Sequence, residues 1–157
     1  MNMEKLNKDM KSLSYFVGAM GLLQVGNLLS PLSAVKDMDF TTLNGVDYTS
    51  TGVSADTILS IVKVMSVIPV VLGILAMFYL CIKGVKEAND PSPAKGHIII
   101  SVICGVCFAF TAFEGVATLL KGGVDVMMSV LEVVLAVCHT ALMFYYFQFA
   151  RKLRTKE

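Results

Sequence analysis

Residues 97–150 read HIIISVICGVCFAFTAFEGVATLLKGGVDVMMSVLEVVLAVCHTALMFYYFQFA, which is two long apolar runs on either side of the short turn Lys121–Asp125. An α-helix rises about 1.5 Å per residue, so about 20 apolar residues cross the hydrocarbon core of a bilayer. The two runs, His97–Leu120 and Val124–Ala150, both reach this length. Because the turn between them is tight, they must be antiparallel neighbours. They therefore predict a transmembrane helical hairpin.

Two further runs of similar length precede this hairpin, at Leu13–Val35 and Thr57–Ile82. Hydrophobic residues make up 55% of the chain and charged residues 16%, whereas a soluble domain carries about 25% charged residues. In lipid every backbone polar group must be satisfied within its own segment, so runs of this length form helices. We therefore predict an all-α integral membrane protein, a single four-transmembrane-helix bundle over residues 1–157 that contacts the lipid bilayer.

Lysine and arginine are distributed unevenly along the chain, although the net charge is only +1. Ten cations lie in the N-terminal segment, in the connection between the second and third runs, and in the C-terminal tail: Lys5, Lys8, Lys11, Lys83, Lys86, Lys95, Arg151, Lys152, Arg154 and Lys156. The other two connections hold only Lys36 and Lys121. Since cytoplasmic loops carry the excess of cations, both termini are expected in the cytoplasm, with the protein in the plasma (inner) membrane.

The connections between the runs differ in composition. The outer loop Lys36–Asp56 is about 20 residues long and rich in turn formers, and Asn44-Gly45 predicts a short β-hairpin within it. The connection Glu87–Gly96 contains two prolines and several turn formers, so it is expected to be a defined break between two helical hairpins.

Polar residues recur at helical spacing inside the apolar runs and define one polar layer. Steps of three and four residues place Cys104, Cys107, Thr111, Glu114 and Thr118 on one face of the third helix. The same steps place Asp125, Ser129, Glu132, Ala136, His139 and Met143 on one face of the fourth. Counting from the outer boundaries puts Lys63, Glu114, Glu132 and Asn27 at one depth, roughly 10–12 Å below the outer surface. His139 falls near the midplane.

Two interpretations of this layer remain open. Insertion of a lysine or an acidic residue at the centre of a transmembrane helix costs about 2.5–3.5 kcal/mol, so Lys63 needs Glu114 or Glu132 as a partner. In the functional interpretation, the layer binds a proton or cation from the outer face and His139 is an inner relay. In the structural interpretation, an ion pair fixes three helices and His139 is hydrogen-bonded to a backbone carbonyl. Intramembrane ionisable residues are often functional, but one sequence does not decide between the two.

Cys104-Gly-Val-Cys107 is the remaining pattern with known chemistry. Such a pair resembles the redox pair of membrane oxidoreductases of the vitamin K epoxide reductase kind, which lies in a four-helix bundle. Here both cysteines lie in the inner half of a helix, and neither outer loop contains a cysteine to exchange with them. Cysteine in such positions packs as a small hydrophobic residue. No nucleotide-binding loop, metalloprotease motif or nucleophile elbow is present, so we expect no cofactor, no metal site and no nucleic-acid partner.

Three functional hypotheses follow, in order of preference. The first is an oligomeric channel or transporter for protons, cations or a small solute that uses Lys63, Glu114 and Glu132. The second is a non-conducting scaffold or subunit of a membrane complex that docks a partner protein through its outer loop or its cytoplasmic connection. The third is a membrane oxidoreductase that uses Cys104 and Cys107. The first is preferred because three ionisable groups at one depth exceed what a scaffold requires.

Overall fold

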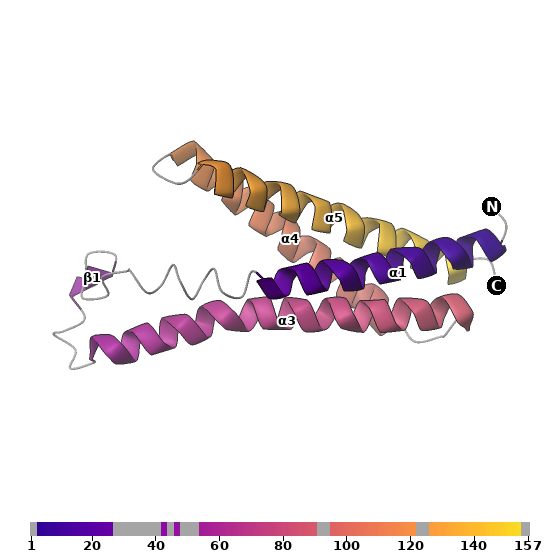
Figure 1. The fold of residues 1–157 in the computed structure, drawn as a ribbon, viewed down its shortest axis with the longest axis horizontal. Coiled ribbons are helices and arrows are strands. Elements are labelled where there is room, and N and C mark those ends of the chain that lie inside the picture. The colour runs from indigo at the N-terminus through magenta and orange to yellow at the C-terminus, as the bar shows by residue number, and fades with distance from the viewer. Residues whose placement is uncertain are drawn as a thin grey trace. The chain divides into compact units, whose positions relative to one another are not determined.

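The computed structural model describes residues 3–26, 42–43, 46–47, 54–90, 95–121 and 126–154. Within these residues the chain is helical apart from one pair of short strands (Figure 1). The elements in chain order are α1 (Met3–Gly26), β1 (Thr42–Leu43), β2 (Val46–Asp47), α3 (Ala55–Asn89), α4 (Gly96–Lys121) and α5 (Val126–Arg154).

Among the described residues, three helical segments are long and apolar enough to cross a membrane, namely Ser60–Asn89, Gly96–Lys121 and Ser129–Arg154. They support the membrane class that the composition predicts, and they overlap most of the predicted runs Thr57–Ile82, His97–Leu120 and Val124–Ala150. The first run, predicted at Leu13–Val35, is helical as far as Gly26, and its remaining residues lie outside the described part of the chain. The count of four membrane spans therefore stays a prediction.

The hairpin predicted in the outer loop is present. Strands β1 and β2 pair antiparallel, with Thr42 opposite Asp47 and Leu43 opposite Val46. The two residues between the strands are Asn44 and Gly45, a pair that favours the tight turn a two-residue hairpin needs. This prediction is confirmed.

Helix α3 is longer at both ends than the apolar run that predicts it. It begins after Ser54, whose hydroxyl oxygen accepts a hydrogen bond of 3.3 Å from the backbone N–H of Thr57, as a helix N-cap does. At the other end it continues through Glu87 to Asn89, so the first part of the predicted connection is helical. The helix ends only where Asp90 precedes Pro91, because proline disfavours the α conformation of the residue before it.

The described residues fall into two compact units. One comprises Met1–Met20 and Ala76–Glu157, and is called the bundle unit below; the other is Gly21–Leu75. Helices α1 and α3 each contribute to both units, because the boundaries fall within them. The single domain predicted from the length of the chain is not tested by this division.

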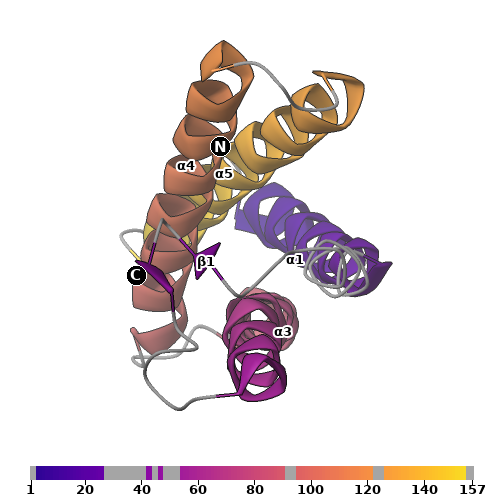
Figure 2. The same ribbon diagram turned by 90° about the vertical axis from the view of Figure 1, so that its left-hand side faces the viewer.

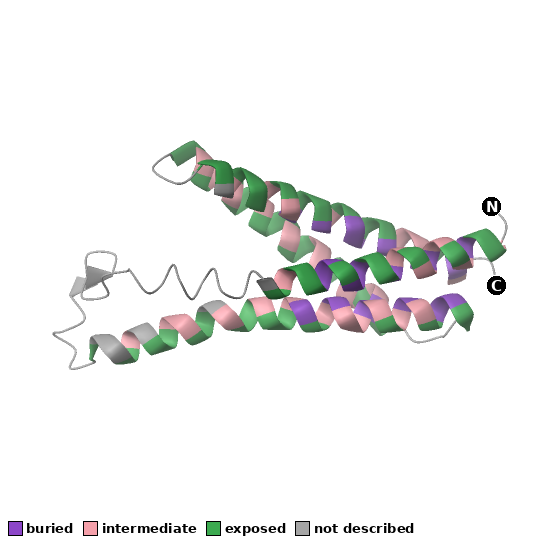
Figure 3. Ribbon diagram, viewed as in Figure 1, coloured by how far each residue is buried: buried purple, intermediate pink, exposed green. Residues whose placement is uncertain are grey.

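The core of the bundle unit lies toward the end of α3 that carries Glu87, which is called the Glu87 end below. Figure 3 shows the buried positions of α1, α3 and α5 gathering there. The fully buried side chains follow helical spacing along each helix: Leu6, Met10, Ser14 and Val17 on α1, Met77, Leu80 and Glu87 on α3, and Met143, Tyr146 and Leu153 on α5. Each helix thus buries one stripe, and every stripe includes a polar group or lies beside one.

Helices α4 and α5 pack side by side along their length and run antiparallel (Figure 2). Glycines on α4 permit the close approach. A Cβ atom added to Gly105 would lie 3.3 Å from Met143 Cβ, and one added to Gly115 would lie 2.6 Å from Val133 Cγ2. The antiparallel hairpin predicted from the short turn is therefore confirmed.

Candidate functional site

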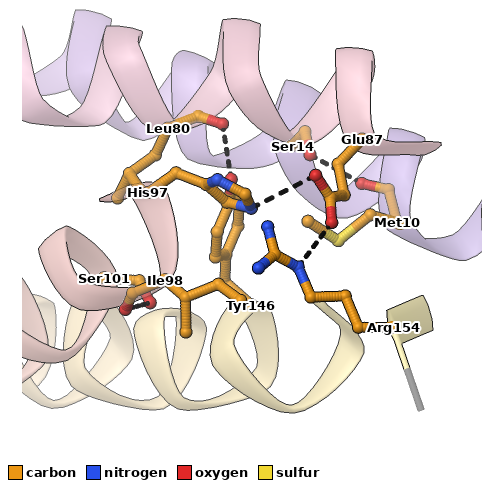
Figure 4. Close-up of polar contacts among 9 residues, drawn as sticks. All are labelled: Met10, Ser14, Leu80, Glu87, His97, Ile98, Ser101, Tyr146 and Arg154. Carbon is orange, nitrogen blue, oxygen red and sulfur yellow. Dashed lines mark hydrogen bonds and ion pairs between the residues drawn. The ribbon is translucent and has the colours of Figure 1, made fainter. Parts of the chain in front are cut away.

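The most buried charged group of the described chain is the carboxylate of Glu87, near the end of α3. Its side chain is 1% exposed, and its Oε1 accepts a hydrogen bond of 2.7 Å from Arg154 Nε of α5. His97, in the first turn of α4, places Nε2 at 3.9 Å from Glu87 Oε2. That distance permits an electrostatic contact but is too long for a hydrogen bond. In Figure 4, dashed lines join one oxygen of the Glu87 carboxylate to the His97 ring and the other to Arg154.

Tyr146 of α5 extends this cluster toward the middle of the bundle unit. Its hydroxyl donates a hydrogen bond of 2.8 Å to the backbone carbonyl of Leu80 on α3. Its ring meets the His97 ring edge to face, with centroids 6.1 Å apart and an interplanar angle of 84°. The Tyr146 side chain is fully buried, so its hydroxyl needs this protein partner. Glu87, His97, Tyr146 and Arg154 are called the Glu87 cluster below.

Small residues bring three helices together beside the cluster. A Cβ atom added to Gly84 of α3 would contact Ser14 Oγ of α1 and would lie 2.8 Å from the hydroxyl of Tyr146. The Ser14 hydroxyl donates a hydrogen bond of 2.7 Å to the backbone carbonyl of Met10, so it is satisfied within α1. One turn away, a Cβ atom on Gly18 would lie 2.8 Å from Cys81 Sγ. These contacts bring α1 and α3 close together beside the Glu87 cluster.

The Glu87 cluster both pairs buried charges and connects helices. A buried carboxylate loses its hydration, and the attraction of the Arg154 guanidinium offsets that loss only while both groups stay in place. The ion pair connects α3 to α5, His97 adds α4, and the contacts of Gly84 add α1. The cluster thus fixes the Glu87 end of the bundle unit, where the sequence predicts a cytoplasmic surface.

The two carboxyl groups of the predicted polar layer lie elsewhere, on the parts of α4 and α5 nearest the turn between them. Both Glu114 and Glu132 are exposed in the structure, and neither forms an ion pair with a described residue of the bundle unit. The residues that follow them, Gly115 and Val133, are in direct contact across the hairpin. Glu114 and Glu132 therefore lie within about one helical turn of each other along the hairpin.

His139 is buried, with 4% of its surface exposed, between these carboxyl groups and the Glu87 cluster. Its Nδ1 donates a hydrogen bond of 2.7 Å to the backbone carbonyl of Leu135, as the structural interpretation of the sequence predicts. Its ring stacks on Phe108 of α4 with centroids 4.6 Å apart. Its role as a relay stays a prediction.

The other members of the predicted layer cannot be assigned to the same site. Lys63 is half-buried and belongs to the unit Gly21–Leu75, which is described separately from the bundle unit. Asn27 lies outside the described residues. The layer as a whole therefore stays a prediction, and the structure shows only that Glu114 and Glu132 lie at similar levels along the hairpin.

Cys81, Cys104, Cys107 and Cys138 are free thiols. Cys104 is half-buried and Cys107 is exposed, both on α4. Within the part of the chain that the structure describes, no group of three His, Cys, Asp or Glu side chains is arranged to hold a metal ion.

The Glu87 cluster was missed from the sequence because Glu87 and Arg154 were assigned to polar segments outside the membrane. A signal was available in the spacing. Leu80, Gly84 and Glu87 follow one helical face of α3, and His139, Tyr146 and Leu153 recur every seven residues on α5. Continuing the apolar stripe of α3 past the end of its run includes Glu87 in the buried face of that helix, although it does not identify the partner helix.

No family model, no curated protein and no solved structure matches the chain.

Proposed function

We propose that this multi-pass membrane protein moves protons or cations across the bilayer, with Glu114 and Glu132 as the binding groups. One observation carries the proposal, which is the pair of exposed carboxyl groups at similar levels of a largely apolar hairpin. Both lie within segments that are long and apolar enough to cross a membrane.

The free-energy cost of inserting Glu114 and Glu132 into a membrane favours a functional role for these two residues. Each acidic side chain at the centre of a transmembrane helix costs about 2.5–3.5 kcal/mol to insert, so two of them oppose the membrane insertion of this hairpin. Such groups normally face a bundle interior or a water-filled cavity rather than lipid. Their carboxyl oxygens are ligands for protons and hard cations. Lys63 and Asn27 remain proposed members of the same polar layer.

The remaining polar groups of α5 define the proposed path of the proton or cation along this helix, from Glu132 toward the Glu87 end. His139 follows Glu132 by seven residues and Tyr146 follows His139 by seven, so the three lie along one face of the helix about 10 Å apart. Gaps of that length require water or a movement of the helices between proton transfers. His139 is the proposed relay, and the Glu87 cluster closes the path at the Glu87 end.

Topology and assembly complete the proposal. The distribution of lysine and arginine favours a cytoplasmic side for the Glu87 end and both termini, and the proposed location is the plasma (inner) membrane. A homo-oligomer would cover the exposed Glu114 and Glu132 with protein instead of lipid. In this proposal the protein that covers the two carboxyl groups is a second copy of the chain, whereas in the next candidate it is a different membrane protein.

A non-conducting scaffold is the second candidate, and the same exposed acidic face favours it. If a helix of a different membrane protein covers Glu114 and Glu132, the carboxyl groups are docking contacts and no ion moves. The redox hypothesis for Cys104 and Cys107 ranks third, because no observation on the described residues adds to the sequence pattern.

Flux measurements on purified protein in liposomes separate the first two candidates. We expect proton or cation flux in the wild type and its loss in Glu114→Gln and Glu132→Gln, with all proteins folded by circular dichroism and size exclusion. Asp90→Asn is the matched control, since Asp90 is an exposed carboxylate at the end of α3, away from the hairpin turn. Tight liposomes for the folded wild type under every ion gradient would contradict transport and favour the scaffold.

A further inference from the structure

A groove of about 400 Å³ runs between α4 and α5 on the surface of the bundle unit. Its size falls within the range of sites that hold small ligands, which is about 300–1,000 Å³. On the α4 side, the small residues Gly105 and Ala109 leave the groove open. Its apolar walls are formed by Val102, Val106, Phe144 and Phe147. The groove therefore lies within segments suited to the hydrocarbon core of a membrane.

The polar atoms in the groove are already occupied. The Ser101 hydroxyl donates a hydrogen bond of 2.7 Å to the carbonyl of Ile98, and the Thr140 hydroxyl donates one of 2.9 Å to the carbonyl of Ala136. Both hydroxyls are thus satisfied by their own helices. An occupant of this groove gains affinity from apolar contact alone, which fits a hydrocarbon chain.

Two exposed cations continue the groove-lining stripes toward the Glu87 end. On α5, Arg151 follows Phe147 by four residues and Phe144 by seven, so it shares their face. On α4, Lys95 precedes Val102 by seven residues and caps the helix, since its carbonyl accepts the backbone N–H of Ile98 at 3.1 Å. By helical rise, the two residues stand about 6 and 10 Å beyond the groove.

These cations suit a phosphate group. Arginine and lysine near a membrane surface bind lipid phosphates, and the positive end of the α4 dipole beside Lys95 adds to the attraction. Arg154, only three residues from Arg151, is already paired with Glu87 inside the bundle. Lys95 and Arg151 are therefore the exposed cations that the two groove-lining faces present at the Glu87 end.

From this combination we infer that the groove binds one anionic phospholipid of the leaflet at the Glu87 end. An acyl chain fills the apolar groove between α4 and α5, and the headgroup phosphate lies between Lys95 and Arg151. The two cations favour an anionic headgroup, and the apolar groove favours binding of the acyl chain. This inference does not depend on the proposed transport function, because it uses neither Glu114 nor Glu132.

Electron paramagnetic resonance of spin-labelled lipids tests the inference on the whole protein in phosphatidylcholine bilayers. Spin-labelled phosphatidylglycerol should associate with the protein more strongly than spin-labelled phosphatidylcholine. The preference should fall by about fivefold for each cation removed in Lys95→Gln and Arg151→Gln. The control pair is Lys5→Gln and Lys8→Gln, two exposed cations of α1, and it should keep the preference.

The groove itself is tested by Ala109→Leu, which places a larger side chain in it. This variant should lower the immobilised fraction of phosphatidylglycerol, whereas Ala141→Leu, on an exposed position of α5 outside the groove, should not. Equal association of both lipids with the wild type would overturn the inference. So would an unchanged preference in Lys95→Gln with Arg151→Gln, or a wild-type dimer that Ala109→Leu dissociates without any change in bound lipid.

Discussion

Glu87 and Arg154 lie 67 residues apart in the chain, and their side chains form a hydrogen-bonded ion pair of 2.7 Å inside the protein. The pair joins the last turn of α3 to the last turn of α5. With His97 nearby and α1 packed against Gly84, it defines the end at which four helices meet. The local contacts at this end give predictions that do not depend on the function of the protein.

Gly84→Ala should destabilise the protein, because the new methyl group would contact Ser14 and Tyr146 on two other helices. Overpacking of this kind costs about 1–3 kcal/mol, measured as the loss in free energy of unfolding in detergent micelles. Gly73→Ala, also within α3, is the control. Its added Cβ would lie 3.5 Å from Gln24 Oε1, an ordinary contact, so the higher helix propensity of alanine should leave stability equal or increased. Equal effects of the two substitutions would contradict the close approach at Gly84.

Tyr146→Phe should lower the free energy of unfolding by about 0.5–1.5 kcal/mol, since it removes the hydrogen bond to the Leu80 carbonyl and keeps the buried ring. Tyr145→Phe makes the same chemical change at the next position, which is exposed, and should have little effect. Chemical denaturation of both variants side by side gives the comparison. A loss as large in Tyr145→Phe as in Tyr146→Phe would argue against the specific bond.

Gly18→Cys should form a disulfide with Cys81 on mild oxidation. A Cβ atom at position 18 would lie 3.2 Å from Cys81 Cβ, and bonded cysteines have Cβ atoms about 3.5–4.5 Å apart, so a small shift is enough. Labelling of the denatured protein with a maleimide polymer counts the thiols that remain. Ala19→Cys, one exposed residue further along α1, should leave Cys81 reduced. Failure of Gly18→Cys to link would contradict the packing of α1 against α3.

The apolar runs predicted most of α3, α4 and α5, because membrane spans are set by length and hydrophobicity, which a sequence states directly. Helix α1 begins at Met3, ten residues before the run that predicts it. The tight turn before Val126 predicted the pairing of α4 with α5, and Asn44-Gly45 predicted the hairpin of β1 and β2. The Glu87 cluster was not predicted. Glu87 is polar and precedes two prolines, so it resembles a loop residue. Its burial depends on partners from α4 and α5 that only the folded arrangement brings together.

For Glu114 and Glu132, in contrast, the sequence predicts the positions of the two residues along the hairpin but not their surroundings. Their shared level follows from counting residues along two helices that a short turn connects, and the contact of Gly115 with Val133 agrees with it. What faces these carboxyl groups depends on the packing of further helices or subunits, and periodicity within one helix carries no information about that. Their role is therefore a proposal that flux measurements decide.

A double-mutant cycle on Glu87 and Arg154 tests most directly the claim that this ion pair holds the helices together. Glu87→Gln or Arg154→Met alone removes one member of the pair and leaves the opposite charge, on the partly buried Arg154 or on the buried Glu87, so each should lower the free energy of unfolding, by up to about 3–5 kcal/mol. The double variant removes both charges, so it should lose far less than the sum of the two single losses. Single losses below about 1 kcal/mol, or strictly additive losses, would contradict the account.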